Sequence, residues 1–210
     1  TQSNDKPNQG YENKIISAGI STAFEQYRNL RLSLGLDASY DDLRTDSTAS
    51  DSLKKQSGSF TEVIGTYGFS YDKRNRAFMP TSGSILRFNQ TLPVYADKSF
   101  IANTISSSNY KTITEDIIGA GKIFISAING LGSDDVMLSK RRGLSSKRMR
   151  GFEKGKIGPV DGTDHVGGNH AAALNFEVNL PSLLPESTNT DIGLFLDFAN
   201  VWGIDYDSTL

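Results

Sequence analysis

The sequence AAALNFEVNL at residues 171–180 alternates apolar and polar side chains. Every even-numbered residue from 172 to 180 is apolar, and the odd-numbered residues between them include Asn175, Glu177 and Asn179. Successive side chains of a β-strand point to opposite faces of the sheet, so this period of two predicts a strand with one apolar face and one polar face.

The same period of two recurs along the chain. It is found at residues 13–24, 27–40, 62–72, 84–94, 100–111, 117–128 and 192–198. Ile64 and Gln90 are exceptions, because each lies on the wrong face of its segment. No segment has the 3.6-residue period of an amphipathic helix. The sequence therefore predicts an all-β protein with about eight antiparallel strands.

The connections between the predicted strands are of two kinds. Short or moderate connections lie at residues 25–26, 79–83, 112–116 and 181–190, and long ones lie at residues 41–59 and 129–168. Outer-membrane β-barrels have short turns at one end, long loops at the other, and strands of about ten residues. Apart from a brief join at residues 96–99, short and long connections alternate, and this favours a transmembrane β-barrel.

A soluble β-sandwich or lipocalin-like barrel remains an alternative, because the alternation alone does not tell which face points inward. A membrane barrel has a polar lumen and aromatic residues at both membrane interfaces. The polar faces here carry the charged residues Arg31, Glu62, Arg87, Lys122, Glu177 and Asp197. Aromatic residues fall near predicted strand ends at Tyr40, Tyr71, Phe78, Tyr95, Phe100 and Trp202. Both observations favour the membrane.

The composition excludes several classes of function. The 210 residues carry a formal net charge of -2, which provides no basic surface for nucleic acid. The chain has no cysteine, so disulfide frameworks and thiolate metal sites are excluded. No apolar run reaches the roughly 18 residues that a membrane helix needs. Because the chain begins at Thr1 and not at a methionine, we also expect it to be a piece of a longer protein.

One stretch of the long segment 129–168 fits no strand or helix pattern. Residues 149–159 read MRGFEKGKIGP, with an arginine, an aromatic residue and four glycines or prolines. We interpret this stretch as a loop that occupies a specific position. The basic run at residues 140–150 is most simply explained as a segment that faces solvent or lipopolysaccharide.

Five short motifs in the second half of the chain resemble those of the BamA family of outer-membrane insertases, in the same order and spacing. They are MRGF at 149–152, IGP at 157–159, VGGN at 166–169, NFE at 175–177 and FLDFANVW at 195–202. Upstream, YDKRNR at 71–76 and PTSG at 80–83 are similar to a strand, turn and next strand of that family. The resemblance covers most of residues 11–206, and the sequence looks most like alphaproteobacterial members.

The resemblance implies a fold and a location. Members of the family have a sixteen-stranded antiparallel transmembrane β-barrel that follows periplasmic POTRA domains. Residues 1–210 would form part of this one barrel domain, with strands six to thirteen and a long lumenal loop at residues 129–168. The POTRA domains and the first and last strands would lie outside the chain. The protein would lie in the outer membrane of a Gram-negative bacterium.

The resemblance also implies a function and partners. The protein would fold β-barrel proteins and insert them into the outer membrane, and it would be no enzyme and need no cofactor. Its partners would be unfolded outer-membrane protein clients, outer-membrane lipid and, through the POTRA domains, periplasmic chaperones and the BAM lipoproteins. No nucleic-acid partner is expected. The alternative is a two-partner-type secretion transporter or pore of the same superfamily, whose lumen the same loop would plug.

Members of the family dock the tip of the long loop on acidic residues of the inner wall. Carried over by motif, the docking residues are Arg150, Gly151 and Phe152 in the tip and Glu177 and Asp197 in the wall. The residue pattern agrees, since Glu177 and Asp197 lie on the polar faces of adjacent predicted strands. An arginine fork suits two carboxylates, whereas a lysine offers only a point charge.

Other candidate sites are weak. His165 and His170 are the two histidines of the chain, and a metal site would need further ligands at fixed geometry. The sequence GAGK at residues 119–122 lacks the spacing of a phosphate-binding loop. Glu177 and Asp197 resemble the carboxylate pair of a glycosidase, yet an arginine partner favours a structural role. We therefore predict no catalytic residue and no metal site.

Overall fold

The computed structural model describes residues 2–6, 9–181, 184 and 191–207. These residues form a nine-stranded antiparallel sheet in the order β1-β2-β3-β4-β5-β6-β7-β10-β11. The strands are β1 (Gln2–Lys6), β2 (Tyr11–Tyr27), β3 (Leu30–Thr45), β4 (Gly58–Asp72), β5 (Gly83–Ala96), β6 (Phe100–Thr114), β7 (Ile117–Gly130), β10 (His170–Leu180) and β11 (Ile192–Trp202). The long loops contain the helices α1 (Asp51–Lys54) and η2 (Leu138–Lys140) and the hairpin of β8 (Val160–Asp161) and β9 (Asp164–His165). Among the described residues, no helix has the length and apolar composition required to cross a bilayer.

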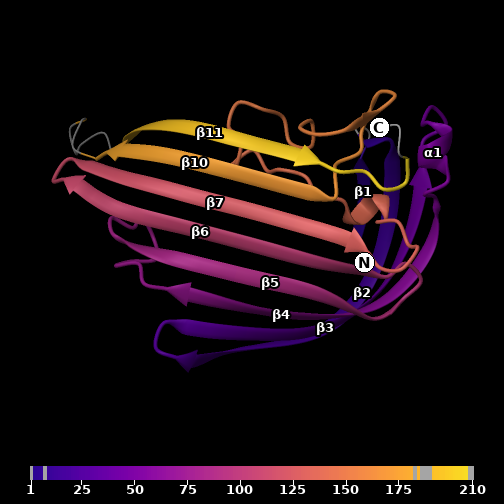
Figure 1. The fold of residues 1–210 in the computed structure, drawn as a ribbon, viewed down its shortest axis with the longest axis horizontal. Helices are drawn as coiled ribbons and strands as arrows, with labels where there is room; N and C mark the ends of the chain where they lie inside the picture. The colour runs from indigo at the N-terminus through magenta and orange to yellow at the C-terminus, as the bar shows by residue number, and fades with distance from the viewer. Residues whose placement is uncertain (1, 7–8, 182–183, 185–190, 208–210) are drawn as a thin grey trace.

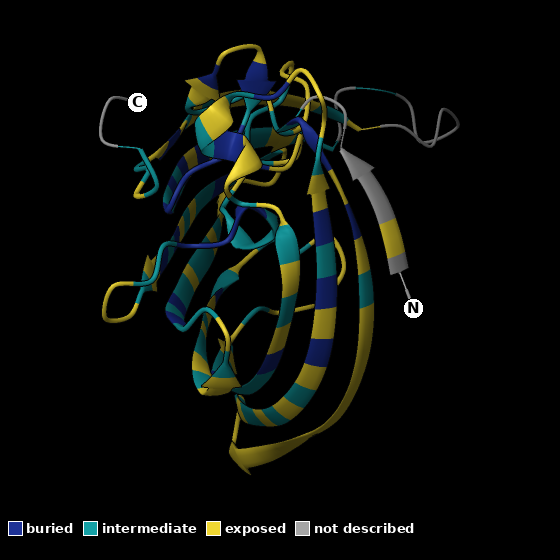
Figure 2. Ribbon diagram, turned by 90° about the vertical axis from the view of Figure 1, so that its right-hand side faces the viewer, coloured by how far each residue is buried: buried dark blue, intermediate teal, exposed yellow. Residues whose placement is uncertain are grey.

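The sheet curves into a trough, and exposed and buried residues alternate along its strands (Figure 2). One face exposes large apolar side chains, which include Ile20, Leu34, Tyr67, Val94 and Leu196. The other face carries buried polar side chains, which include Ser39, Asp41, Glu62, Ser126 and Asn175. This arrangement is that of a membrane barrel and the reverse of a soluble sandwich, whose apolar faces point inward. The predicted fold class is therefore confirmed, and the soluble alternative is wrong.

The two exceptions to the alternation have local explanations. Ile64 lies on the polar face but packs against the buried cluster of Phe100, Ala102, Ile128 and Val136. Beside it, the register between β4 and β5 shifts by one residue, at Val94 of β5. Gln90 donates a hydrogen bond from Nε2 to Oδ1 of Asn103 on the next strand, at 2.6 Å. Each misplaced side chain thus finds a partner of its own polarity.

The first turn differs from the prediction. β2 continues to Tyr27 and the chain reverses at Arg28 and Asn29, not at residues 25–26. Asn29 has a φ of 68°, and its N–H donates to Oε1 of Glu25 at 3.0 Å. Asparagine tolerates this left-handed conformation, which allows a tight turn three residues beyond the predicted joint.

The two long loops, β3–β4 and β7–β10, lie at one end of the sheet, together with the short β5–β6 connection at residues 97–99 (Figure 1). The β2–β3, β4–β5, β6–β7 and β10–β11 connections lie at the other end. The loop predicted at residues 41–59 is shorter than predicted, because β3 extends to Thr45 and β4 begins at Gly58. Between them, Ser50 caps α1 by accepting a hydrogen bond at Oγ from the N–H of Leu53, at 3.0 Å. Most of the connection predicted at residues 181–190 lies outside the described residues.

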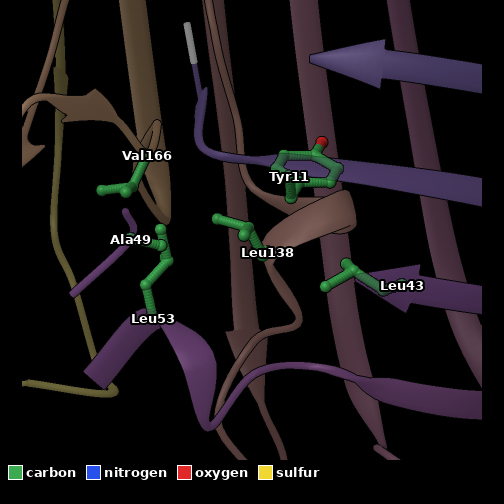
Figure 3. Close-up of a cluster of buried hydrophobic side chains, with 6 residues drawn as sticks. All are labelled: Tyr11, Leu43, Ala49, Leu53, Leu138 and Val166. Atoms are coloured by element: carbon green, nitrogen blue, oxygen red, sulfur yellow. The ribbon is translucent and has the colours of Figure 1, made fainter. Parts of the chain in front are cut away.

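The long loops pack together around one apolar cluster at their end of the sheet. Its members come from β2, β3, the α1 loop and the long loop, and they are Tyr11, Leu43, Ala49, Leu53, Leu138 and Val166 (Figure 3). None of them is more than 5% exposed. This packing gives the loops a fixed position relative to the strands.

Candidate functional site

Residues 131–169 connect β7 to β10 and contact one face of the sheet, which we call the inner face. At the base of this loop, Arg142 N–H donates to the carbonyl of Gly168 at 2.6 Å and Gly168 N–H donates back at 3.0 Å. Leu144 then packs against Ala171, Ala173 and Val201 of β10 and β11. This backbone bridge therefore closes the base of the loop. Between the two bridged residues, residues 143–167 form the rest of the loop, which begins against β10 and β11.

Arg150 contacts two carboxylates of the inner face. Its Nε and Nη2 atoms donate to Oδ2 and Oδ1 of Asp197 at 2.8 and 2.5 Å, and its Nη1 donates to Oε1 of Glu177 at 2.9 Å. The backbone N–H of Arg150 also donates to Oδ2 of Asp197, at 3.0 Å. The hydrogen bonds to Asp197 raise the pKa of Arg150 above its ordinary value, so the guanidinium is charged at any physiological pH. Planar, two-point binding of this kind is specific to arginine.

The wall residues are brought together by the register of β10 and β11. Asn175 lies opposite Asp197, and Glu177 lies opposite Phe195. Because side chains two residues apart share a face, these four positions form one patch on the inner face. The Asn175 amide donates to Oδ1 of Asp197 and to the carbonyl of Arg148, both at 2.8 Å. The patch therefore holds the backbone of the loop as well as the Arg150 side chain.

The patch is balanced in charge. Lys122 of β7 pairs with Oε2 of Glu177, while Arg150 binds Oε1 of the same carboxylate. Two cations thus face two anions, and the Asp197 and Glu177 side chains are only 4% and 15% exposed. A buried carboxylate is tolerated only when it is paired and hydrogen-bonded, so each ion here depends on the others.

The predicted tip residues differ in their roles. Gly151 has a φ of 85°, a left-handed conformation that turns the chain directly after Arg150. Phe152 is 54% exposed, so the structure does not bury it against the wall. The aromatic residue that contacts the tip is Phe195, whose ring centre lies 3.9 Å from the guanidinium carbon of Arg150.

Gly151→Ala is expected to loosen the tip without abolishing its contact with the wall. A left-handed φ costs a residue with a Cβ roughly 1–2 kcal/mol. A Cβ at Gly151 would meet no atom within 4 Å, so steric overlap adds nothing. In the intact protein, trypsin cleavage after the exposed Lys147, measured by mass spectrometry, should become up to about tenfold faster.

Gly143→Ala is the matched control for this substitution. A Cβ at Gly143 also meets no atom within 4 Å, but its φ lies outside the left-handed region. Cleavage after Lys147 should therefore keep its original rate. Equal rates in the two variants would contradict a conformational role for Gly151.

The expectation that the basic run at residues 140–150 faces solvent or lipopolysaccharide is wrong for most of its cations. Lys140 pairs with Glu62, and Arg141 pairs with Asp205. The guanidinium carbon of Arg148 lies 3.4 Å from the ring centre of Phe124, and burial lowers the pKa of Arg148. Lys147 is exposed, as predicted. The sequence pattern could not identify these partners, because they are distant in the chain.

Two further wall residues, Asn175 and Phe195, belong to the site but are not among the residues predicted from the sequence. Asn175 and Phe195 lie in the NFE and FLDFANVW motifs, on the polar face of each strand. An aromatic residue at a polar-face position was the signal for Phe195. The histidines do not form a metal site with other residues, since the described part of the chain holds no group of three potential ligands. His170 instead contacts Trp202, with ring centres 5.7 Å apart and ring planes tilted by 40°.

Sequence comparison relates the chain to proteins of known type. Residues 1–209 match the family model of the Omp85 superfamily domain. The outer membrane protein assembly factor BamA of Neorickettsia risticii is 26% identical over 212 residues, a match that covers 96% of this chain and 28% of that protein. The human sorting and assembly machinery component 50 homolog is 27% identical over 139 residues, covering 64% of this chain and 30% of that protein. The chain thus spans less than a third of the length of these relatives.

Structural comparison relates the fold to a solved barrel. The crystal structure of BamA from Haemophilus ducreyi lacking POTRA domains 1-3 superposes with a TM-score of 0.82 at 22% sequence identity. The match covers 92% of this chain and 42% of that chain. The strands described above therefore have the arrangement of strands in that protein.

Proposed function

The chain belongs to the Omp85 superfamily, and from this premise we propose that it is part of the barrel of a BamA-type factor that folds β-barrel proteins and inserts them into the outer membrane. The names of the bacterial and animal relatives, an outer membrane assembly factor and components of a sorting and assembly machinery, support this function. The superposition on a BamA barrel supports the fold on which it depends.

In this function residues 1–210 are one section of a single barrel domain. The lumenal loop expected at residues 129–168 corresponds to residues 131–169, because β7 extends to Gly130 and β10 begins at His170. The barrel lies in the outer membrane of a Gram-negative bacterium. The apolar side chains on the outer face, such as Leu34 and Leu196, meet the lipid, and the inner face lines the lumen.

The main support for a structural role of the loop is the contact of Arg150 with Asp197 and Glu177. The ion pairs fix the loop tip to β10 and β11, so that this wall and the loop move as one body. An assembly factor of this kind works without chemistry, through the shape of its barrel and of the surrounding bilayer. The balanced charges of the patch support a structural role over proton transfer.

The partners follow from the function. They are unfolded outer-membrane protein clients, outer-membrane lipid and, through POTRA domains, periplasmic chaperones and BAM lipoproteins. The second candidate is a two-partner-type transporter or pore, in which the same loop would plug the lumen. Its support is the match to the Omp85 superfamily domain.

Reconstitution in lipid vesicles tests the proposal against this alternative. The intact protein is inserted into vesicles and given an unfolded β-barrel client on the POTRA side. Insertion is read as protease-protected, heat-modifiable client in the vesicle membrane. Faster insertion than in protein-free vesicles is expected. Release of a passenger into the vesicle lumen, without faster insertion of clients, would overturn the proposal in favour of a transporter.

A further inference from the structure

The loop makes a second set of polar contacts, at the start of its path and on other strands. The helix η2 (Leu138–Lys140) lies against β3 and β4, several strands away in the sheet from the β10 and β11 patch that binds Arg150. Three strands, β5, β6 and β7, separate the two walls.

Lys140 supplies a charge to a buried carboxylate on this wall. Its Nζ atom pairs with Oε1 of Glu62, which also accepts a hydrogen bond from Oγ of Ser39 at 2.8 Å. Ser39 and Glu62 are directly opposite each other on β3 and β4. The Glu62 side chain is 4% exposed and that of Lys140 22% exposed. The ammonium group also lies 5.8 Å from the ring centre of Phe100.

Ser139 makes a parallel contact beside it. Its Oγ donates to Oδ2 of Asp41 on β3 at 2.7 Å, and the Asn13 amide of β2 donates to Oδ1 of the same carboxylate at 2.9 Å. Leu138 shares the apolar cluster of Figure 3 with Tyr11 of β2 and Leu43 of β3. All three residues of η2 therefore contact the wall of β2, β3 and β4.

We propose that Lys140 and Glu62 form a second dock, which fixes the start of the loop to β3 and β4 independently of Arg150. With both docks closed, residues 138–150 form a strap that runs across the lumen from one wall to the other. Lys140 is a positioning residue. The strap's effect on client assembly rests on the proposed function, but the contact itself does not.

The burial of the two ions predicts an asymmetry between substitutions. Lys140→Met leaves the buried Glu62 carboxylate without its cation, and this should cost more free energy than removing the charge of Glu62. Glu62→Gln keeps the shape of the side chain, and the Lys140 ammonium can extend to water on its flexible stem. Replacing both partners together removes both charges. Opening of the dock should therefore be greatest in Lys140→Met, smaller in Glu62→Gln, and smaller in the double variant than in Lys140→Met alone.

Cysteine reporters can measure each dock separately. The 210 residues contain no cysteine, so one engineered cysteine reports one position once any outside them is replaced. Leu138→Cys lies in the cluster on β2 and β3, and Leu144→Cys lies in the cluster on β10 and β11. Both side chains are buried, so a membrane-impermeant maleimide labels each only when its dock opens. Heat-modifiable migration of each variant shows that the barrel is folded.

In the intact protein, Lys140→Met should accelerate labelling of the Leu138→Cys reporter by roughly tenfold to a hundredfold and leave labelling of the Leu144→Cys reporter unchanged. Arg150→Ala should do the reverse. The exchange Lys140→Glu with Glu62→Lys should restore part of the protection of the Leu138→Cys reporter. Lys147→Met is the matched control, because Lys147 belongs to the same basic run and is exposed.

Unchanged protection of the Leu138→Cys reporter in the presence of Lys140→Met, or equal acceleration of both reporters by either variant, would overturn the second dock. Failure of the proposed function gives a different result, because the labelling rates do not depend on client assembly. A protein that inserts no client but labels as expected would retain both docks and lose the assembly role.

Discussion

In the intact protein, Arg150→Glu is expected to abolish most client assembly, and a second substitution, Asp197→Arg, is expected to restore part of it. Arg150→Glu replaces a cation by an anion in a patch that already holds Glu177 and Asp197, with Lys122 as the remaining cation. Three carboxylates then repel one another, and the loop tip must leave the wall.

The magnitude follows from the burial of the ions. Removing one partner of a buried, hydrogen-bonded ion pair costs up to about 3 kcal/mol, and water reduces that value where the pair is exposed. The Asp197 side chain is 4% exposed, whereas that of Arg150 is 28% exposed. We therefore expect a loss of docking in Arg150→Glu that is close to complete, since repulsion adds to the lost attraction.

Asp197→Arg is expected to restore client assembly only in part, because Asp197 also accepts hydrogen bonds from the backbone N–H of residue 150 and from Asn175. With Asp197→Arg the balance of charge returns, but the backbone N–H of Arg150 loses its acceptor. Asn175 can turn its amide oxygen toward the new guanidinium, and it then gives up the hydrogen bond to the Arg148 carbonyl.

The measurement is the level of folded outer-membrane proteins in a strain that depends on the variant. Lys147→Glu makes the same charge change at an exposed position of the same loop and should behave as the unaltered protein. Arg150→Lys should lie between the two, because it keeps the charge and loses the fork. Normal protein levels and growth in Arg150→Glu would remove the docking role.

The second large effect is expected on the outer face. Leu36→Arg should destabilise the folded barrel by about 2–4 kcal/mol if the residue lies near the bilayer midplane, because the outer face meets lipid. Leu36 is central in β3 and its side chain is 47% exposed. The free energy of unfolding is measured by guanidinium titration of the intact protein in lipid vesicles.

Asp37→Arg is the control for this substitution. It introduces the same side chain one residue along, on the face that lines the lumen, where water can solvate it. Its effect should be below about 1 kcal/mol. A larger loss for Asp37→Arg than for Leu36→Arg would show that the lipid faces the opposite side of the sheet.

The strands could be predicted from the sequence because their period is local. The alternation at residues 171–180 recurs in β3, β4 and β5, and it places Glu177 and Asp197 on one face without further information. The direction of that face could not be predicted, since an apolar face suits lipid and protein interior alike. The exposure of side chains such as Leu34 and Leu196 in the structure answers that question.

The contacts of the long loop could be predicted only where a sequence motif identified the contacting residue. Arg150 was identified in this way, and the structure places it against Asp197 and Glu177. Lys140 and Arg141 were interpreted as solvated, because their partners Glu62 and Asp205 lie more than sixty residues away. A run of basic residues looks the same whether its members face water or buried carboxylates, so only the tertiary structure distinguishes the two.

The backbone bridge between Arg142 and Gly168 has a consequence for how the Arg150 contact opens and closes. With the base of the loop pinned, seven residues separate Arg142 from Arg150. A ligand on so short a tether meets its site at an effective concentration on the order of millimolar. This high local concentration speeds rebinding, so an opened Arg150 contact closes again quickly. The pinned base thus returns the loop tip to the same place on β10 and β11 after each opening.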